Sequence, residues 1–119
     1  MQLLINFLLL VFSVVLFFIL RVAGIFYRLF FVRKNLADYF YGGASTLSHG
    51  ANYFGADLWN VILITPGAVS HFGNQDESMS GVIGKNKRTK TLTKLGRLTA
   101  WALNKVEPKH VEKAIEDDE

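Results

Sequence analysis

The stretch that decides the fold is residues 3–20, LLINFLLLVFSVVLFFIL, in which only Asn6 and Ser13 are polar. At about 1.5 Å per residue, a helix of this stretch is about 27 Å long, close to the hydrocarbon thickness of a bilayer. Such a helix is apolar on every side, so a water-soluble domain has no place for it. We therefore expect an N-terminal transmembrane helix. Its anchoring side chains include Leu3, Phe7, Val11, Leu16 and Leu20.

A secretory signal peptide is the competing interpretation of this stretch. It would require basic residues before the apolar run and small residues at a cleavage site after it. Here no basic residue precedes the run, and Arg21 follows it directly, so we expect the helix to be retained. By the positive-inside rule, the basic residues after the run place the N-terminus outside and the rest of the chain in the cytoplasm.

Residues 21–34 continue the helix with arginine and aromatic side chains. Arg21 and Arg28 are seven positions apart, so they share a helix face and can reach lipid phosphates by snorkelling. The alternative is a tilted helix of about thirty residues, in which Arg21 needs water or a partner. The first predicted region, residues 1–34, is thus a transmembrane anchor with a basic amphipathic extension.

The second predicted region, residues 35–73, is rich in glycine and aromatic residues. Gly42-Gly43 predicts either a break in the helical structure or a point of close packing, and tyrosine and tryptophan suit a membrane interface. Asp57 is expected to cap a helix over residues 58–64, which a Thr-Pro-Gly sequence ends. We favour an interfacial or re-entrant segment. A second span over residues 53–72 is the alternative, and it would separate the two basic clusters across the membrane.

The third predicted region, residues 74–119, is small, helical, and first basic and then acidic. Residues 74–106 hold seven basic and two acidic residues, whereas residues 107–119 hold two basic and six acidic ones. This asymmetry predicts charge pairing within the molecule or between copies, and attraction of the basic part to anionic lipid. A final helix is expected to fray at its acidic end. The helix caps expected here are Asn74, Glu77 and Pro108.

Three helices are expected in this region, over residues 74–84, over residues 91–106 and from Pro108 onward. The second has the clearest helical period, with leucines on one face and basic residues on the other. Trp101 lies in the middle of the basic face, where it can anchor at lipid headgroups, stack on a nucleobase or pack against another segment. The residues predicted to contact lipid headgroups or another polyanion are Arg21, Arg28, Arg33, Lys34, Lys87, Arg88, Lys90, Lys94, Arg97 and Trp101.

Two segments resemble motifs of a known family. Residues 74–80, NQDESMS, are similar to Asn-Pro-Asp-Glu-Thr-(Ile/Leu)-Ser, and residues 107–116, EPKHVEKAIE, to Asp-Pro-Gly-His-Cys-x-Lys-(Ala/Ser)-Ile-Glu. Both motifs occur in this order in small proteins encoded by bacteriophages and prophages, and the resemblance covers residues 57–119. It implies a phage origin and no particular activity. Gln75 and Val111 replace the proline and the cysteine of the motifs, so chemistry that needs a His-Cys pair does not carry over.

The composition limits the chemistry that this chain can perform. It has no cysteine, which excludes disulfides, a thiol nucleophile and cysteine-ligated zinc. The residues closest to a catalytic or metal-binding set are Asp76, Glu77 and His110, with Ser78 or Ser80 as a hydroxyl group. Helix capping already explains the two carboxylates. We therefore expect no catalytic site, no metal site and no cofactor.

Three classes of function fit this reading of an all-α membrane protein with one transmembrane helix, interfacial helices and a small C-terminal helical region. We favour a structural or scaffolding protein of a host inner membrane or viral membrane, acting as a homo-oligomer or with other membrane or phage proteins. The second class is a phage lysis-type pore former or its regulator. The third is a membrane-tethered nucleic-acid-binding protein. Lipid headgroups are the simpler target, because the anchor already holds the basic residues near a bilayer.

Overall fold

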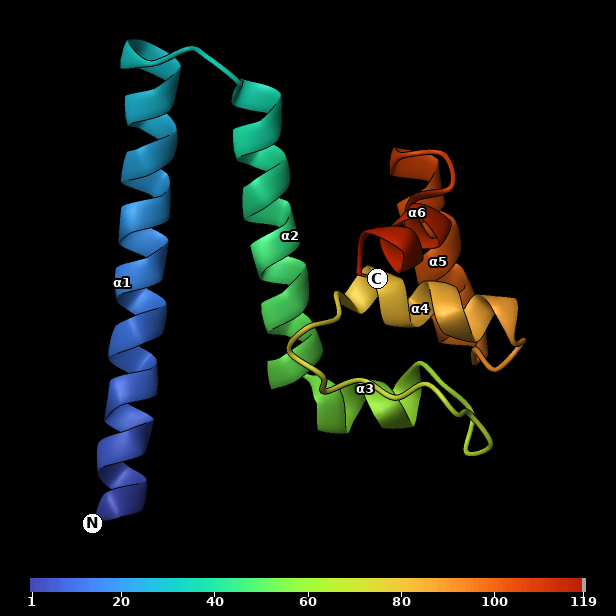
Figure 1. Ribbon diagram of the computed structural model, residues 1–119. Coiled ribbons are helices and arrows are strands. Elements are labelled where there is room, and N and C mark those ends of the chain that lie inside the picture. The colour runs from blue at the N-terminus through green and yellow to red at the C-terminus, as the bar shows by residue number, and fades with distance from the viewer. Residues whose placement is uncertain (119) are drawn as a thin grey trace. The chain divides into compact units, whose positions relative to one another are not determined.

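The computed structural model describes residues 1–118, which form six α-helices and no sheet (Figure 1). The predicted all-α class is confirmed. The chain forms two compact units, Met1–Phe40 and a second unit from Tyr41 onward. We name them unit 1 and unit 2. Residues on both sides of the predicted boundary at position 73 contribute to the core of unit 2.

Unit 1 is built on α1 (Gln2–Phe31), a helix of 30 residues of which none is buried. Its backbone groups satisfy one another along the helix, but its apolar side chains have no protein to cover them. α1 is long and apolar enough to cross a membrane, and a signal sequence near an N-terminus has the same character. The expected continuation of the helix past Arg21 and Arg28 is confirmed. Arg33 and Lys34 follow its end.

The two arginines of α1 share one partner within unit 1. The Arg21 and Arg28 guanidinium carbons lie 4.7 Å and 4.6 Å from the centre of the Tyr39 ring. Arg21 also donates a hydrogen bond of 3.3 Å to the Tyr39 carbonyl oxygen. A cation over an aromatic face gains more when water is excluded, so Tyr39 supplies a partner that an arginine near the end of an apolar segment needs.

Tyr39 belongs to α2 (Leu36–Phe54), a helix of 19 residues that crosses the boundary between the units. Gly42-Gly43 does not break the chain, because both glycines lie inside this helix, whereas Gly43 is buried, as the close-packing alternative predicts. A glycine in a helix lowers helix stability by only about 1 kcal/mol relative to alanine. Tertiary hydrogen bonds from side chains later in α2 offset this loss. Asn52 is fully buried and donates to the carbonyls of Asn74 and Glu77.

α3 (Ala56–Ile62) follows α2 after one residue, Gly55, which is also its N-cap. Asp57 was predicted to cap this helix but lies in its first turn, where the helix dipole still favours a carboxylate. The Trp59 indole folds back over Gly55 and donates a hydrogen bond of 2.9 Å to the Ala51 carbonyl. A side chain at Gly55 would overlap this indole, which explains why a glycine makes this junction.

α4 (Met79–Arg88) begins five residues later than predicted and ends four residues later. Its N-cap is Ser78, whose hydroxyl accepts a hydrogen bond from the Gly81 amide. Asn74 instead closes a turn by accepting from the Asp76 amide, and Glu77 pairs with Lys85. The capping roles predicted for Asn74 and Glu77 are therefore wrong, because a polar turn precedes the helix.

The last two helices are α5 (Lys94–Val106) and α6 (His110–Asp117). Thr93 caps α5 through a bond from the Gly96 amide to its hydroxyl. Pro108 was predicted to be the first residue of the last helix, but it lies in the turn before α6. The N-cap of α6 is Lys109, with a left-handed φ of 60°, because the His110 amide first closes a turn on the Glu107 carbonyl.

The core of unit 2 collects buried side chains from the loop after α3 and from α4, α5 and α6. Val82, Ile83 and Val111 are the most deeply buried aliphatic side chains. An isolated antiparallel bridge joins Ile64 to Leu92 and ties the loop to the segment before α5.

Candidate functional site

Residues 74–80 and residues 107–116, the two motif segments of the sequence, contact one another in unit 2. α4 begins within the first segment, at Met79, α6 begins within the second, and the two helices pack closely. A side chain at Gly84 would overlap the carbonyl oxygen of Val111, so this contact requires a glycine. Gly84 was expected to end a helix, but it lies inside α4 as a point of close approach.

The acidic end of α6 is hydrogen-bonded to the start of α4. Asp118 Oδ2 accepts hydrogen bonds of 3.0 Å from both the amide and the hydroxyl of Ser78. The Asp118 side chain is only 4 % exposed, and its other oxygen lies 3.7 Å from His49 Nε2. A carboxylate at a helix N-terminus is stabilised by the unpaired amides there. The predicted fraying is therefore wrong up to Asp118, whereas Glu119 lies outside the described residues.

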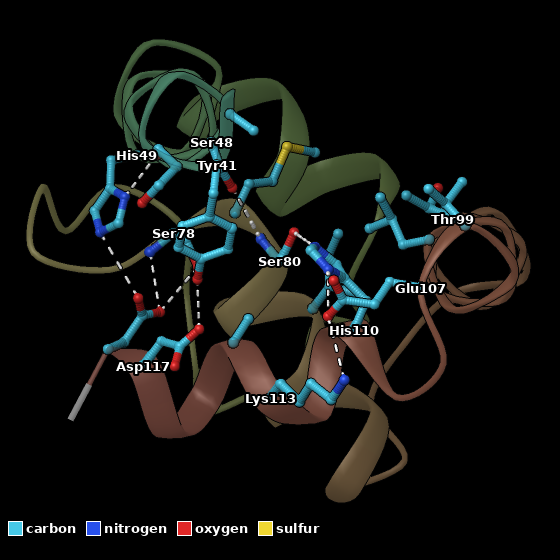
Figure 2. A pocket seen from close by; sticks show the side chains of 18 residues that line it. Tyr41, Ser48, His49, Ser78, Ser80, Thr99, Glu107, His110, Lys113 and Asp117 are labelled. Carbon is cyan, nitrogen blue, oxygen red and sulfur yellow. Dashed lines mark hydrogen bonds and ion pairs between the residues drawn. The ribbon is translucent and has the colours of Figure 1, made fainter. Parts of the chain in front are cut away.

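A pocket of about 510 Å³ lies among α2, α4, α5 and α6. This volume falls within the usual range of small-molecule sites. One wall is apolar and comes from α4 and α5, with Met79, Ile83 and Leu103. Figure 2 shows that polar side chains also line the pocket, from α2, from the start of α4 and from both ends of α6. They include Tyr41, Ser48, His49, Ser78, Ser80 and His110.

Ser80, His110 and Glu107 form a short polar chain at one side of this pocket (Figure 2). His110 Nε2 lies 3.1 Å from the Ser80 hydroxyl, within hydrogen-bond distance. Glu107 Oε1 lies 3.7 Å from His110 Nδ1, beyond a hydrogen bond, and 3.5 Å from Lys113 Nζ. The arrangement is best described as a polar rim.

The sequence predicted a different polar set, of which only part is assembled. His110 and Ser80 meet at the rim, whereas Glu77 forms an ion pair of 2.5 Å with Lys85. Asp76 is in the turn closed by Asn74 and does not line the pocket. Within residues 1–118, no three histidine or acidic side chains gather as metal ligands.

Tyr41 and Asp117 form a second polar contact beside the pocket. The Tyr41 hydroxyl donates a hydrogen bond of 2.6 Å to Asp117 Oδ2. This bond, with smaller effects from burial and nearby carboxylates, raises the pKa of Tyr41 above its usual 10.0. Tyr41, Ser48 and His49 were not predicted as pocket residues, because their segment was expected to break rather than to form a continuous helix.

The basic residues before α5 are partly neutralised within unit 2. Lys87 forms an ion pair with Glu112, and this hydrogen bond is the main reason why the pKa of Glu112 is lowered. The Asn104 amide also donates to Glu112. Pairing between the basic and acidic segments within one molecule is thus confirmed for Lys87. Other predicted headgroup contacts in unit 2 remain exposed, namely Arg88, Lys90, Lys94, Arg97 and Trp101.

No family model matches the chain, and neither a curated protein nor a solved structure matches it. Function must then be inferred from the chemistry of the chain itself. Two features are available for that purpose. One is the uncovered apolar surface of α1, and the other is unit 2, with its pocket and its exposed basic and aromatic side chains.

Proposed function

We propose that this chain is a non-catalytic, phage-related membrane protein in which α1 is the anchor and unit 2 is a structural or interaction module. The observation that carries the proposal is that none of the 30 residues of α1 is buried. A bilayer supplies the apolar surroundings that unit 1 does not. The setting is a host inner membrane or a viral membrane, with the N-terminus outside and unit 2 on the cytoplasmic side.

The energetics of α1 favour lipid. Between Leu3 and Leu20 every residue except Asn6 and Ser13 is leucine, isoleucine, valine or phenylalanine. Each such residue favours insertion by about 0.3–0.6 kcal/mol at a helix centre, so together they contribute about 5 kcal/mol or more. Arg21 and Arg28 follow this stretch, which supports an anchor whose cytoplasmic end begins near Arg21.

Unit 2 supports an interaction role more than catalysis. Its pocket has a mixed apolar and polar lining, and the Glu107 carboxylate lies 3.7 Å from His110 without a hydrogen bond to it. The chain's partners in this proposal are the bilayer and either further copies of itself or other membrane or phage proteins. A lysis-type pore former and a membrane-tethered nucleic-acid binder are the alternatives.

The anchor is tested by replacing Leu9 and Val15 with arginine in the full chain. Two charges near the middle of the span cost about 5 kcal/mol or more, so we expect the double variant to leave the membrane fraction after alkaline extraction. The matched control replaces the same residues with alanine and stays in the membrane. If the arginine variant is retained like wild type, the anchor lies elsewhere and the proposal fails.

Mass spectrometry of the membrane-bound protein addresses the signal-sequence alternative, because a retained anchor leaves residues 1–31 attached. Expression in a bacterial host separates the remaining classes. Growth arrest with loss of membrane potential indicates a pore former. Cross-linked assemblies without toxicity support the scaffold. Salt-sensitive retention of nucleic acid by the detergent-solubilised protein indicates the nucleic-acid binder.

A further inference from the structure

The face by which α5 packs in unit 2 differs from the face that its leucines predict. The buried residues of α5 are Gly96 and Ala100, with Leu103 partly buried beside them. A side chain at Gly96 would overlap the Leu63 carbonyl oxygen, so small residues let α5 approach the backbone of the loop. The packed face is turned by roughly 100° from the leucine face. The packing of this helix is therefore set by close approach.

This rotation leaves a mixed apolar and basic face of α5 uncovered. Leu98 is 58 % exposed, Trp101 is 59 % exposed and Val106 is 88 % exposed. At 3.6 residues per turn, Lys94 and Lys105 fall on the same arc as Leu98 and Trp101. The Lys105 ammonium lies 5.6 Å from the centre of the Trp101 ring. We refer to residues 94, 95, 98, 101, 102, 105 and 106 as the outer face of α5.

We propose that the outer face of α5 docks on the anionic surface of the bilayer that holds α1. This inference rests on the proposed membrane anchor and adds a second point of contact with lipid. The leucine and valine side chains would enter the headgroup boundary, as in interfacial amphipathic helices. Trp101 is amphipathic and suited to that depth, and Lys94 and Lys105 would meet lipid phosphates.

The charges and the apolar side chains favour lipid over other occupants. A second copy of this face would bring Lys94 and Lys105 against their own counterparts across a symmetric interface, and like charges repel there. Single-stranded nucleic acid would use Trp101 and the lysines, but it offers nothing apolar for the exposed Leu98 and Val106. An anionic bilayer matches both kinds of side chain.

The test uses the full chain reconstituted in vesicles that contain brominated lipid, which quenches nearby tryptophan. Trp101→Phe identifies the signal of Trp101, because Trp59 is the only other tryptophan. We expect Trp101 to be quenched in vesicles with anionic lipid. The quenching should be lost in purely zwitterionic vesicles and at high salt. Flotation of the vesicles measures α1 anchoring in the same samples.

Matched variants decide whether the outer face is responsible. Lys94→Gln and Lys105→Gln should each lower the docking equilibrium about fivefold, and Leu98→Gln should also weaken it. Lys109→Gln changes an exposed lysine on another element and should leave quenching unchanged.

The other outcomes separate failure of docking from failure of the anchor on which docking rests. Protein that floats with the vesicles while Trp101 stays unquenched refutes docking and leaves the anchor intact. Protein that does not float refutes the anchor. A Trp101 signal that responds only to added single-stranded DNA assigns the outer face to nucleic acid. A Trp101 signal that responds only to protein density in the vesicles assigns this face to a second copy. Either result refutes docking on lipid.

Discussion

α1 and α4 reverse the usual relation between hydrophobicity and burial. α1 is almost entirely apolar and has no buried residue. α4 ends in Lys85, Asn86, Lys87 and Arg88, yet six of its ten residues are buried. The buried set of α4 is Ser80, Gly81, Val82, Ile83, Gly84 and Asn86. Composition therefore indicates which solvent a helix prefers, whereas burial inside a small unit depends on which neighbours can come close.

Close approach in unit 2 depends on glycine and on fully bonded asparagine. Gly81, Gly84 and Gly96 each face an atom that a side chain would overlap. Asn52 and Asn86 are completely buried, and every buried side-chain polar atom in residues 1–118 has a hydrogen-bond partner. A unit of this size has little apolar core, so hydrogen bonds and small residues must fix its packing. α1 needs neither.

The largest expected effect comes from Gly84→Ala in α4. The added methyl group would overlap the Val111 carbonyl, which is backbone and cannot rotate away. We expect α4 and α6 to be forced apart and the free energy of unfolding of unit 2 to fall by about 3 kcal/mol or more. Denaturant unfolding followed by circular dichroism in detergent measures this change.

Gly50→Ala in α2 is the matched control for that substitution. Nothing lies within 4 Å of a side-chain carbon at Gly50, so alanine should stabilise the helix by about 0.5–1 kcal/mol. Equal effects of the two substitutions would show that helix propensity, and not close approach, governs α4. The comparison between α1 and α4 would then lose its physical basis.

The next effect concerns Asn52, which joins α2 to the turn before α4. Its amide donates to the carbonyls of Asn74 and Glu77, and its oxygen accepts from the Gly73 amide at 2.9 Å. Asn52→Ala leaves the Glu77 carbonyl and the Gly73 amide without their partner and removes one of the two donors to the Asn74 carbonyl, at a cost of about 2–3 kcal/mol. Thermal unfolding measures the loss. Asn60→Ala, which removes bonds to Phe72 at a less buried site, should cost less.

A result in which Asn52→Ala unfolds like wild type would mean that apolar volume alone holds unit 2 together. Hydrogen exchange at the Gly73 amide gives an independent measurement, because this amide should lose protection in the variant. Loss of protection at the Gly73 amide without a fall in the unfolding temperature would show that Asn52 stabilises only the turn before α4.

The smallest expected effect is the titration of Tyr41. Its pKa is raised by the hydrogen bond to Asp117, so this bond stabilises unit 2 below pH 10.0 and is lost as the pH rises through the folded-state pKa. Ultraviolet titration should therefore show that the Tyr41 phenol ionises above pH 10.0. Asp117→Asn should move that phenol toward its usual pKa, whereas Asp57→Asn should not. A late phenol that persists in Asp117→Asn would contradict this assignment.

Much of the helical content could be predicted from the sequence. The apolar run defined α1, the Thr-Pro-Gly sequence ended α3 close to its observed end, and the period of leucines located α5 to within three residues at its start. Each of these signals is local, because it depends on residues within one element.

The rest could not be predicted because it depends on contacts across the chain. Gly42-Gly43 predicts a break locally, but the distant Asn74 and Glu77 carbonyls help hold α2 as a helix through Asn52. Ser78 is the cap of α4 because Asp118, forty positions away, accepts a hydrogen bond from the Ser78 amide. The pocket was missed for the same reason, since His49 and His110 come from helices that only tertiary packing brings together.

The contact between Asp118 and Ser78 has a consequence for synthesis of the chain. α1 is held by bonds between residues four apart, so it can form as soon as it leaves the ribosome. The first turn of α4 gains its carboxylate only after forty further residues have been translated. An anchor of this kind can insert into a bilayer while unit 2 is still unfolded, and unit 2 folds after it. A tag joined just after Asp118 would therefore disturb folding more than one placed before Gln2.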